Sequence, residues 1–197
     1  MSIQAQQPAL QVITVNTSDA AGYVEWSKTA LPVIADNFEG VLLMGTCIPT
    51  QGAQMEGDIY SFGFASSHDA LLAVDLNSPA VASEISRVAS MRRVRARDVW
   101  SVLRNTGRAI PVGGMFALYN LFVNTNSSND YVSALSRIEA ALHENGFDDV
   151  AVAAYYVNTG EYAGQVVASF YANSTQRLGA LLDAMNGASF AEVFASI

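Results

Sequence analysis

The chain has 197 residues, of which 51% are hydrophobic and only 14% are charged, and its net charge is −8. A disordered chain lacks this much apolar area, so the composition excludes one. A general nucleic-acid binder needs an electropositive face, and the acidic balance argues against nucleic acid as a partner. The low charged fraction predicts extensive buried surface, either between two halves of the chain or between subunits.

Cysteine usage and the apolar stretches bear on the compartment. Cys47 is the single cysteine, so the sequence offers no internal disulfide and no zinc-type cysteine spacing. Residues 1–8 carry neither a positive charge nor the apolar run of a signal peptide. The longest apolar stretches, 41–44 and 150–157, are far shorter than the ~20 residues that a membrane helix needs. We therefore expect a cytoplasmic protein with no membrane partner.

The chain contains an internal repeat. Val15-Asn16-Thr17 recurs as Val123-Asn124-Thr125, and Ser61-Phe62 recurs as Ser169-Phe170 at the same offset. Further matches between these points keep the offset nearly constant, which chance matches would not do. The sequence therefore predicts two copies of one structural unit.

Both copies predict the same order of elements. Alternating, β-rich segments predict strands at 10–17, 41–48, 58–65 and 93–103 in the first copy and at 115–125, 150–157 and 165–172 in the second. Helical patterns and caps predict helices at 20–37 and 129–145, and shorter ones after Ser66-Ser67 and Asn173-Ser174. This βαββα(β) order is that of the ferredoxin-like split unit. The second copy shows no equivalent of the 93–103 strand.

The predicted strands carry apolar side chains on a face that helices do not cover. Tyr60, Phe62 and Phe64 stand on one side of their strand, and Phe170 is expected on the matching side in the second copy. Two such faces in one chain are buried if they pack against each other and close a barrel. The predicted fold class is α+β: two tandem ferredoxin-like modules, whose antiparallel sheets pack face to face as a pseudo-dimeric α/β barrel. We expect modules at 1–104 and 115–197, joined by a linker at 105–114.

With this organisation, the chain resembles the dimeric α/β-barrel superfamily over about residues 10–196. The resemblance rests on the element order, on the break in the second helix at Asn77-Ser78-Pro79, and on residues 99–103, which are similar to the family's last strand. The superfamily includes cofactor-free monooxygenases of the antibiotic-biosynthesis type, muconolactone isomerases and haem-degrading proteins. The resemblance implies the fold and leaves the function open.

The arginines cluster in one stretch, residues 87–108. Arg93, Arg95 and Arg97 alternate with smaller residues, so on a regular strand all three point to one face about 7 Å apart. A row of guanidinium groups suits a carboxylate, a phosphate or an enolate. In the alternative interpretation the row caps the surface of the acidic protein, or it pairs with Asp98, Glu84 and the acidic residues of the other copy.

Five further residues complete the candidate site. Tyr60 and Phe62 are expected in the core or barrel lining first, and in a substrate cage second. Asn16 and Asn124 occupy equivalent strand ends, either as turn residues or as polar groups in a cavity. His68 begins a predicted helix, and the resemblance makes haem a remote possibility there; otherwise no cofactor and no metal is expected.

Two functions remain open from the sequence. The first is a small-molecule-binding α/β barrel, with cofactor-free monooxygenase-like or isomerase-like activity on an anionic aromatic or keto-enol compound. The second is a non-catalytic binding or assembly protein whose barrel is filled by its own side chains. The expected partner is a small-molecule ligand, and the chain is either a pseudo-dimeric monomer or a homodimer.

Overall fold

The computed structural model describes residues 7–107, 115–187 and 190. The chain forms two compact units. The first lies within residues 1–101 and 158–161, and the second within residues 102–157 and 162–197. The expected module boundaries stay predictions, and residues 108–114 of the expected linker lie outside the described residues.

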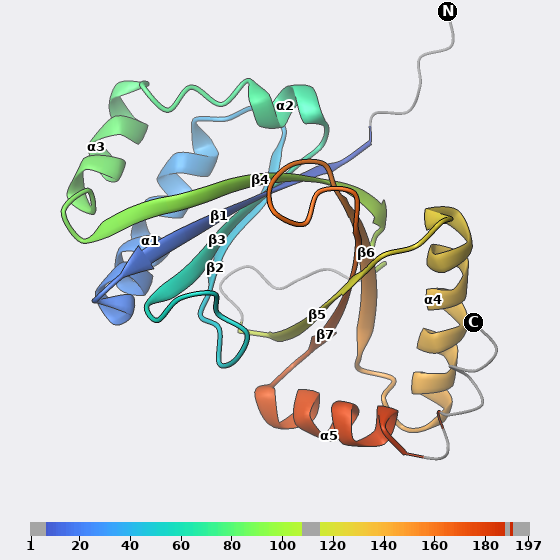
Figure 1. The fold of residues 1–197 in the computed structure, drawn as a ribbon. Helices are drawn as coiled ribbons and strands as arrows, with labels where there is room; N and C mark the ends of the chain where they lie inside the picture. The colour runs from blue at the N-terminus through green and yellow to red at the C-terminus, as the bar shows by residue number, and fades with distance from the viewer. Residues whose placement is uncertain (1–6, 108–114, 188–189, 191–197) are drawn as a thin grey trace, which may run out of the picture. The chain divides into compact units, whose positions relative to one another are not determined.

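The first unit is an antiparallel sheet with helices on one face. Its elements are β1 (Ala9–Thr17), α1 (Ala20–Asp36), β2 (Val41–Cys47), β3 (Asp58–Ala65), α2 (His68–Leu72), α3 (Pro79–Arg87) and the greater part of β4 (Arg92–Arg104). The strand order is β2-β3-β1-β4. Helices α1 and α3 lie together beside these strands (Figure 1). This is the predicted ferredoxin-like order.

The second unit repeats that plan. Its elements are β5 (Ala117–Val123), α4 (Ser128–Glu144), β6 (Ala151–Val157), β7 (Val166–Ala172) and α5 (Thr175–Met185). The strand order is β6-β7-β5, and α4 runs alongside β6 (Figure 1). The two copies of a βαββα unit that the sequence predicts are therefore confirmed. None of the described helices is long and apolar enough to cross a membrane.

The helices begin at polar caps, as the sequence predicts. The side chain of Ser67 accepts a hydrogen bond from the Ala70 N–H at 3.0 Å, and Ser174 accepts one from the Arg177 N–H at 3.1 Å. These bonds satisfy N–H groups that have no partner within the helix.

Each unit has its own apolar core between its helices and its sheet. In the first unit, Tyr23, Trp26 and Ile34 of α1 pack with Val15 of β1 and Ile59 of β3. The spacing of the α1 residues places them on one stripe of the helix, which faces the sheet.

In the second unit, Leu135, Ile138 and Leu142 of α4 pack with Val152 of β6 and Phe170 of β7. These three residues belong to the apolar stripe that the sequence predicts for this helix.

Phe170 corrects one expectation. It lies in the core beneath the helices rather than on the opposite face, where its sequence counterpart in β3 lies. In the first unit Val15 pairs with Ile59, and its counterpart Val123 pairs with Val166 in the second. The offset between β3 and β7 is therefore one residue smaller in the structure than in the sequence alignment of the two copies. Because side chains alternate along a strand, a slip of one residue moves each of them to the other face.

The end of β4 belongs to the second unit. Residues 102–104 lie next to β6 in the strand order. Glu139 accepts a hydrogen bond from the Val152 N–H at 2.9 Å, and Arg104 donates one to the Val152 carbonyl and forms a salt bridge with Glu139. Two side chains thus satisfy both backbone groups of Val152.

We expect Leu135→Ala to destabilise the protein by about 2–5 kcal/mol, because this side chain is fully buried and its removal leaves a cavity. The matched control is Leu72→Ala, at a position that is 71% exposed, and it should change stability by less than about 0.5 kcal/mol. Urea unfolding curves measure both. Equal effects would contradict the assignment of the core.

Candidate functional site

The sheet of the first unit has one face that its helices do not cover, which we call the helix-free face. Val15 and Ile59 point into the helical core, so the residues that alternate with them point the other way. The helix-free face carries, from one end to the other, Asn16, Thr14, Val12 and Leu10 of β1, opposite Asp58, Tyr60, Phe62 and Phe64 of β3.

A β-bulge in β4 decides where the arginines point. The register with β1 shifts between Thr14 and Val15, and this shift leaves Arg95 without a partner of its own. A bulge adds one residue to one strand, so the alternation of side chains changes on passing it.

The sequence predicts that the three arginines form a row on one face, and this prediction is wrong. Arg93 lies opposite Asn16, on the helix-free face, whereas Arg97 lies opposite Ile13, which packs against the helical core. Cross-strand neighbours point to the same side of a sheet. The bulge separates Arg97 from the other two.

Arg95 forms a salt bridge with Asp58, at one end of the helix-free face. The Asp58 side chain is 0% exposed and that of Arg95 is 21% exposed. Asp58 also accepts hydrogen bonds from Asn16 Nδ2 at 3.0 Å and from the Met55 N–H at 3.1 Å. A buried carboxylate is tolerated when its charge is paired and its oxygens are bonded, and these contacts meet both conditions. The acidic partner of Arg95 is thus Asp58 of the same copy, and not Asp98, Glu84 or a residue of the other copy.

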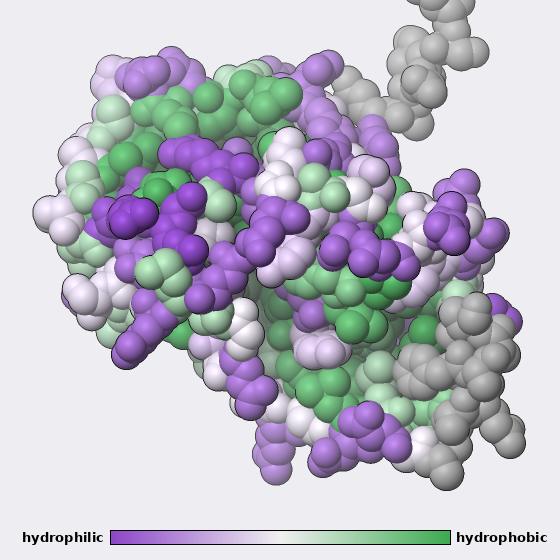
Figure 2. Space-filling model, in the orientation of Figure 1, coloured by the Kyte–Doolittle hydropathy of each residue, from purple (hydrophilic) through white to green (hydrophobic). Residues whose placement is uncertain are grey.

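Arg93 lies beside the cluster of Asn16, Asp58 and Arg95 but takes no part in its salt bridge. Its side chain is exposed, and it forms none of the salt bridges found among the described residues. Strongly hydrophilic side chains gather over the part of the first unit where β4 and β1 run (Figure 2). A guanidinium group in this position can bind a carboxylate or an enolate in two parallel hydrogen bonds.

The aromatic part of the helix-free face adjoins the polar end. Tyr60 and Phe62 are partly exposed, and the rings of Phe62 and Phe64 meet edge to face at 6.0 Å. The Phe62 ring rests on Gly45, where an added Cβ would lie 2.4 Å from Phe62 Cζ. Cys47 lies opposite Tyr60, and burial raises the pKa of its thiol to about 11, so it stays protonated at neutral pH.

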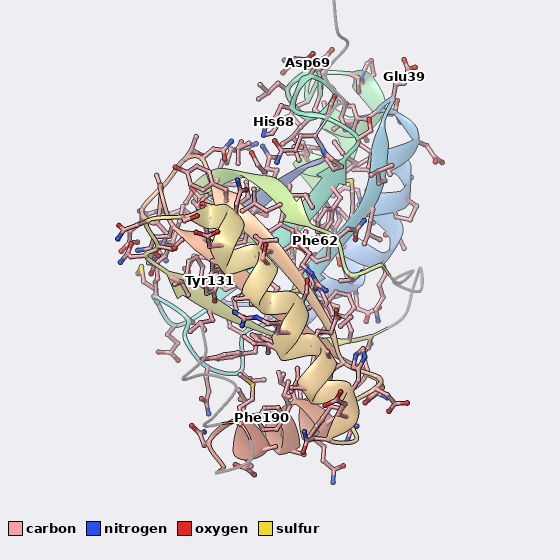
Figure 3. The ribbon with its side chains drawn as sticks, turned by 90° about the vertical axis from the view of Figure 1, so that its right-hand side faces the viewer. Glu39, Phe62, His68, Asp69, Tyr131 and Phe190 are labelled. Atoms are coloured by element: carbon pink, nitrogen blue, oxygen red, sulfur yellow. The ribbon has the colours of Figure 1, made fainter. Side chains whose placement is uncertain are left out.

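His68 lies on the other side of the sheet. Its Nε2 atom is 3.1 Å from Ser101 Oγ, which is also bonded to Asn158 Nδ2 at 3.0 Å. Ser101 is opposite Ala9, a residue that packs against Leu71 of α2. Figure 3 shows His68 at the start of α2 and Phe62 on the sheet. The structure therefore does not bring His68 to the arginines and aromatic residues.

One ring nitrogen of His68, Nε2, is hydrogen-bonded to Ser101, so this bond would have to break before Nε2 could bind a haem iron. Across the described part of the chain, no three His, Cys, Asp or Glu side chains are grouped so that they could hold a metal ion.

Asn124 directly follows β5 and is exposed in the second unit. Asn16 lies in the first unit, so a shared site for these two residues stays a prediction.

The sequence analysis missed Asp98 as a site residue. It lies on the helix-free face opposite Val12, and Val12 is in turn opposite Phe62. Its carboxylate lies against Gly160, and its pKa is raised by burial and by the nearby charge of Glu161. A stretch of alternating arginines does not reveal which carboxylate will share their face, so the sequence carried no signal for this residue.

No family model matches the chain, and no curated protein matches it. Solved structures do. A provisionally assigned monooxygenase of Fusobacterium nucleatum has 10% identity and a TM-score of 0.66, over 98% of this chain and 87% of the other. A provisionally assigned monooxygenase of Lactobacillus acidophilus has 10% identity and a TM-score of 0.59, over 96% and 87%. A provisionally assigned chlorite dismutase has 7% identity and a TM-score of 0.57, over 90% and 85%.

The chain has the same fold as these three structures. The likeness extends over both copies of the repeat, so it confirms the predicted fold class of tandem ferredoxin-like modules. At these identities the likeness concerns the fold, and the chemistry has to be argued from the side chains.

We expect Arg95→Gln to destabilise the protein by roughly 1.5–3 kcal/mol, because it leaves the buried Asp58 carboxylate without its cation. Arg97→Gln removes a charge from the same strand at an exposed position, and it should have little effect on stability. Chemical denaturation compares the two variants. Similar stabilities would show that the Arg95 pair is not a structural anchor.

The raised pKa of Asp98 predicts that the stability of the protein depends on pH. Its pKa is raised in the folded state, so its charged form is disfavoured there. Asp98 therefore lowers the free energy of unfolding least below its unfolded-state pKa, where it is protonated in both states. Part of the stability is lost as the pH rises through its folded-state pKa. Asp98→Asn should make the protein more stable at neutral pH, and this gain should shrink below about pH 4. Thermal unfolding across pH 3–8 tests this; a gain that does not vary with pH would contradict it.

Proposed function

We propose that the helix-free face of the first unit binds a small anionic aromatic or keto-enol compound, and that the chain acts on it as a cofactor-free monooxygenase-like or isomerase-like enzyme. The observation that carries the proposal is Arg93, an exposed cation without a salt bridge among the described residues, at the edge of an aromatic sheet face. Unpaired cations beside apolar surface are the elements from which anion-binding sites for aromatic acids are built.

The roles of the residues follow from their positions. Arg93 binds the carboxylate or enolate oxygen. Asn16, Asp58 and Arg95 form a fixed cluster beside it, which holds this end of the sheet in place without consuming the charge of Arg93. A fixed cation next to a developing enolate lowers the energy of that anion.

Tyr60 and Phe62 contact the ring of the ligand and exclude water from it. Water exclusion strengthens the attraction between the guanidinium group and the anion, because the local dielectric falls. All of these residues belong to the first unit, so one chain carries the complete proposed site.

The fold supports this proposal without deciding it. Two of the similar structures carry provisional names as monooxygenases. The superfamily hosts several chemistries, so the argument for ligand binding depends on Arg93 and its aromatic neighbours.

One observation favours the second candidate, a non-catalytic binding or assembly protein. Phe62 packs on Gly45 and against Phe64, so part of the helix-free face is filled by the protein's own side chains. In that case no small aromatic acid would find room there.

A thermal-shift titration with 2-naphthoate separates the two candidates. A ligand that binds only the folded state raises the melting temperature, and at a fixed ligand concentration the rise grows with the logarithm of its affinity. We expect a rise with the wild-type protein and a roughly tenfold or larger loss of affinity in Arg93→Gln, because a hydrogen bond to a charged group contributes about 1.5–3 kcal/mol.

The matched control is Arg97→Gln, which removes an exposed arginine from the other face of the same strand and should bind as the wild type does. Haem in the same screen should not raise the melting temperature. An unchanged melting temperature with naphthoate and related aromatic acids would favour the non-catalytic alternative.

A further inference from the structure

We infer that Asp98 is a specificity-determining residue: it selects ligands that carry a hydroxyl or enol group at the end opposite their anion. The inference rests on the proposed function, because it assumes that Arg93 binds the anion. It adds a second polar contact, and with it the orientation of the ligand and a narrower substrate class.

The first step is that Arg93 and Asp98 share a face. Arg93 lies opposite Asn16, and Asp98 lies opposite Val12, both on the helix-free face. The two residues are five positions apart on β4, which corresponds to about 15 Å of strand. An arginine side chain spans a good part of that distance, so a ligand of two fused rings can reach from the guanidinium group to the carboxylate.

The second step is the surface between the two charged groups. Val12 lies between Asp98 on β4 and Phe62 on β3, in one row across the sheet. Arg93 lies in the row of Asn16 and Asp58, and the row of Thr14 and Tyr60 separates it from the row of Val12 and Phe62. A ligand that reaches from Arg93 to Asp98 therefore crosses the row of Thr14 and Tyr60 before it meets the carbon surface beside Asp98.

The third step is that Asp98 is held in place by a loop. In the residues that follow β6, the Asn158 N–H donates to the Val99 carbonyl at 2.9 Å, and Thr159 Oγ1 accepts from the Val99 N–H at 2.9 Å. These bonds bring Gly160 against Asp98, where an added Cβ would lie 2.0 Å from Asp98 Oδ1. Gly160 also has a φ of +96°, which favours glycine.

The fourth step is the charge at this end. Asp98 forms no salt bridge with any residue in the described ranges, and Glu161 lies close enough to raise its pKa. Two neighbouring carboxyl groups repel a second anion, but an ionised Asp98 accepts a hydrogen bond from a neutral hydroxyl. A charge-assisted hydrogen bond of this kind is stronger than one between neutral groups.

The test compares two probes, 2-naphthoate and 6-hydroxy-2-naphthoate, which differ only by a hydroxyl at the end opposite the carboxylate. In the wild-type protein at pH 7, we expect the hydroxylated probe to bind roughly tenfold more tightly. In Asp98→Asn this advantage should fall to about twofold or less, with little change in the affinity for 2-naphthoate. Isothermal titration calorimetry measures all four affinities.

Three further variants make the result specific. Arg93→Gln should weaken both probes by the same factor, since it removes the contact that they share. Gly160→Ala should reduce the hydroxyl advantage while leaving every charge in place, because the added methyl group displaces the Asp98 carboxylate. Asp69→Asn removes an exposed carboxylate from α2 and should change neither affinity.

The outcomes separate the two proposals. If neither probe binds the wild-type protein, the proposed function fails, and the role of Asp98 fails with it. If both probes bind with equal affinity, or if Asp98→Asn keeps the full advantage, the role of Asp98 is wrong while the anion site at Arg93 stands.

Discussion

The chemistry of the first unit depends on one extra residue in β4, the bulge opposite Thr14 and Val15. On a regular strand, residues an odd number of positions apart point to opposite faces. Arg93 and Asp98 are an odd number of positions apart, yet both lie on the helix-free face because the bulge stands between them. A cation and a carboxylate therefore lie on the same face of this sheet.

The bulge and the buried ion pair stabilise each other. Arg95, the residue without a partner in the ladder, is the one whose side chain reaches Asp58. The fully buried carboxylate needs a nearby cation, since an unpaired charge is costly away from water. In return, the salt bridge fixes the side chain of the bulged residue. Three arginines that look alike in the sequence thus differ in their contacts: Arg95 pairs with Asp58, Arg97 faces the other side, and Arg93 is exposed and forms no salt bridge among the described residues.

The sequence predicted the helices and strands well, but it predicted poorly which face of the sheet each strand residue lies on, and the reason is physical. The strand over 58–65 and the apolar stripe of α4 follow from local periodicity, and the helix starts follow from local caps. A bulge, or a slip of one residue between β3 and β7, leaves that periodicity almost unchanged but reverses which side chains meet. The arginine stretch and the aromatic segment both form strands, as that periodicity predicts. The contacts of Arg95 and the position of Asp98 depend on pairing between strands, which a single sequence does not contain.

The duplication explains how two distant loops come to serve one sheet. The loop between β2 and β3 ends at Asp58, where the Met55 N–H binds the carboxylate, and the loop between β6 and β7 brings Gly160 against Asp98. Residues 158–161 of this second loop belong to the first unit, although the chain before and after them belongs to the second. Equivalent hairpin loops of the two copies therefore each support one carboxylate of the same helix-free face. The loops differ in what they leave available: Asp58 is buried and paired with Arg95, whereas Asp98 stays partly exposed and without a salt bridge among the described residues. Because of that difference, Asp98 rather than Asp58 is the carboxylate without a salt bridge among the described residues on the face that also carries Arg93.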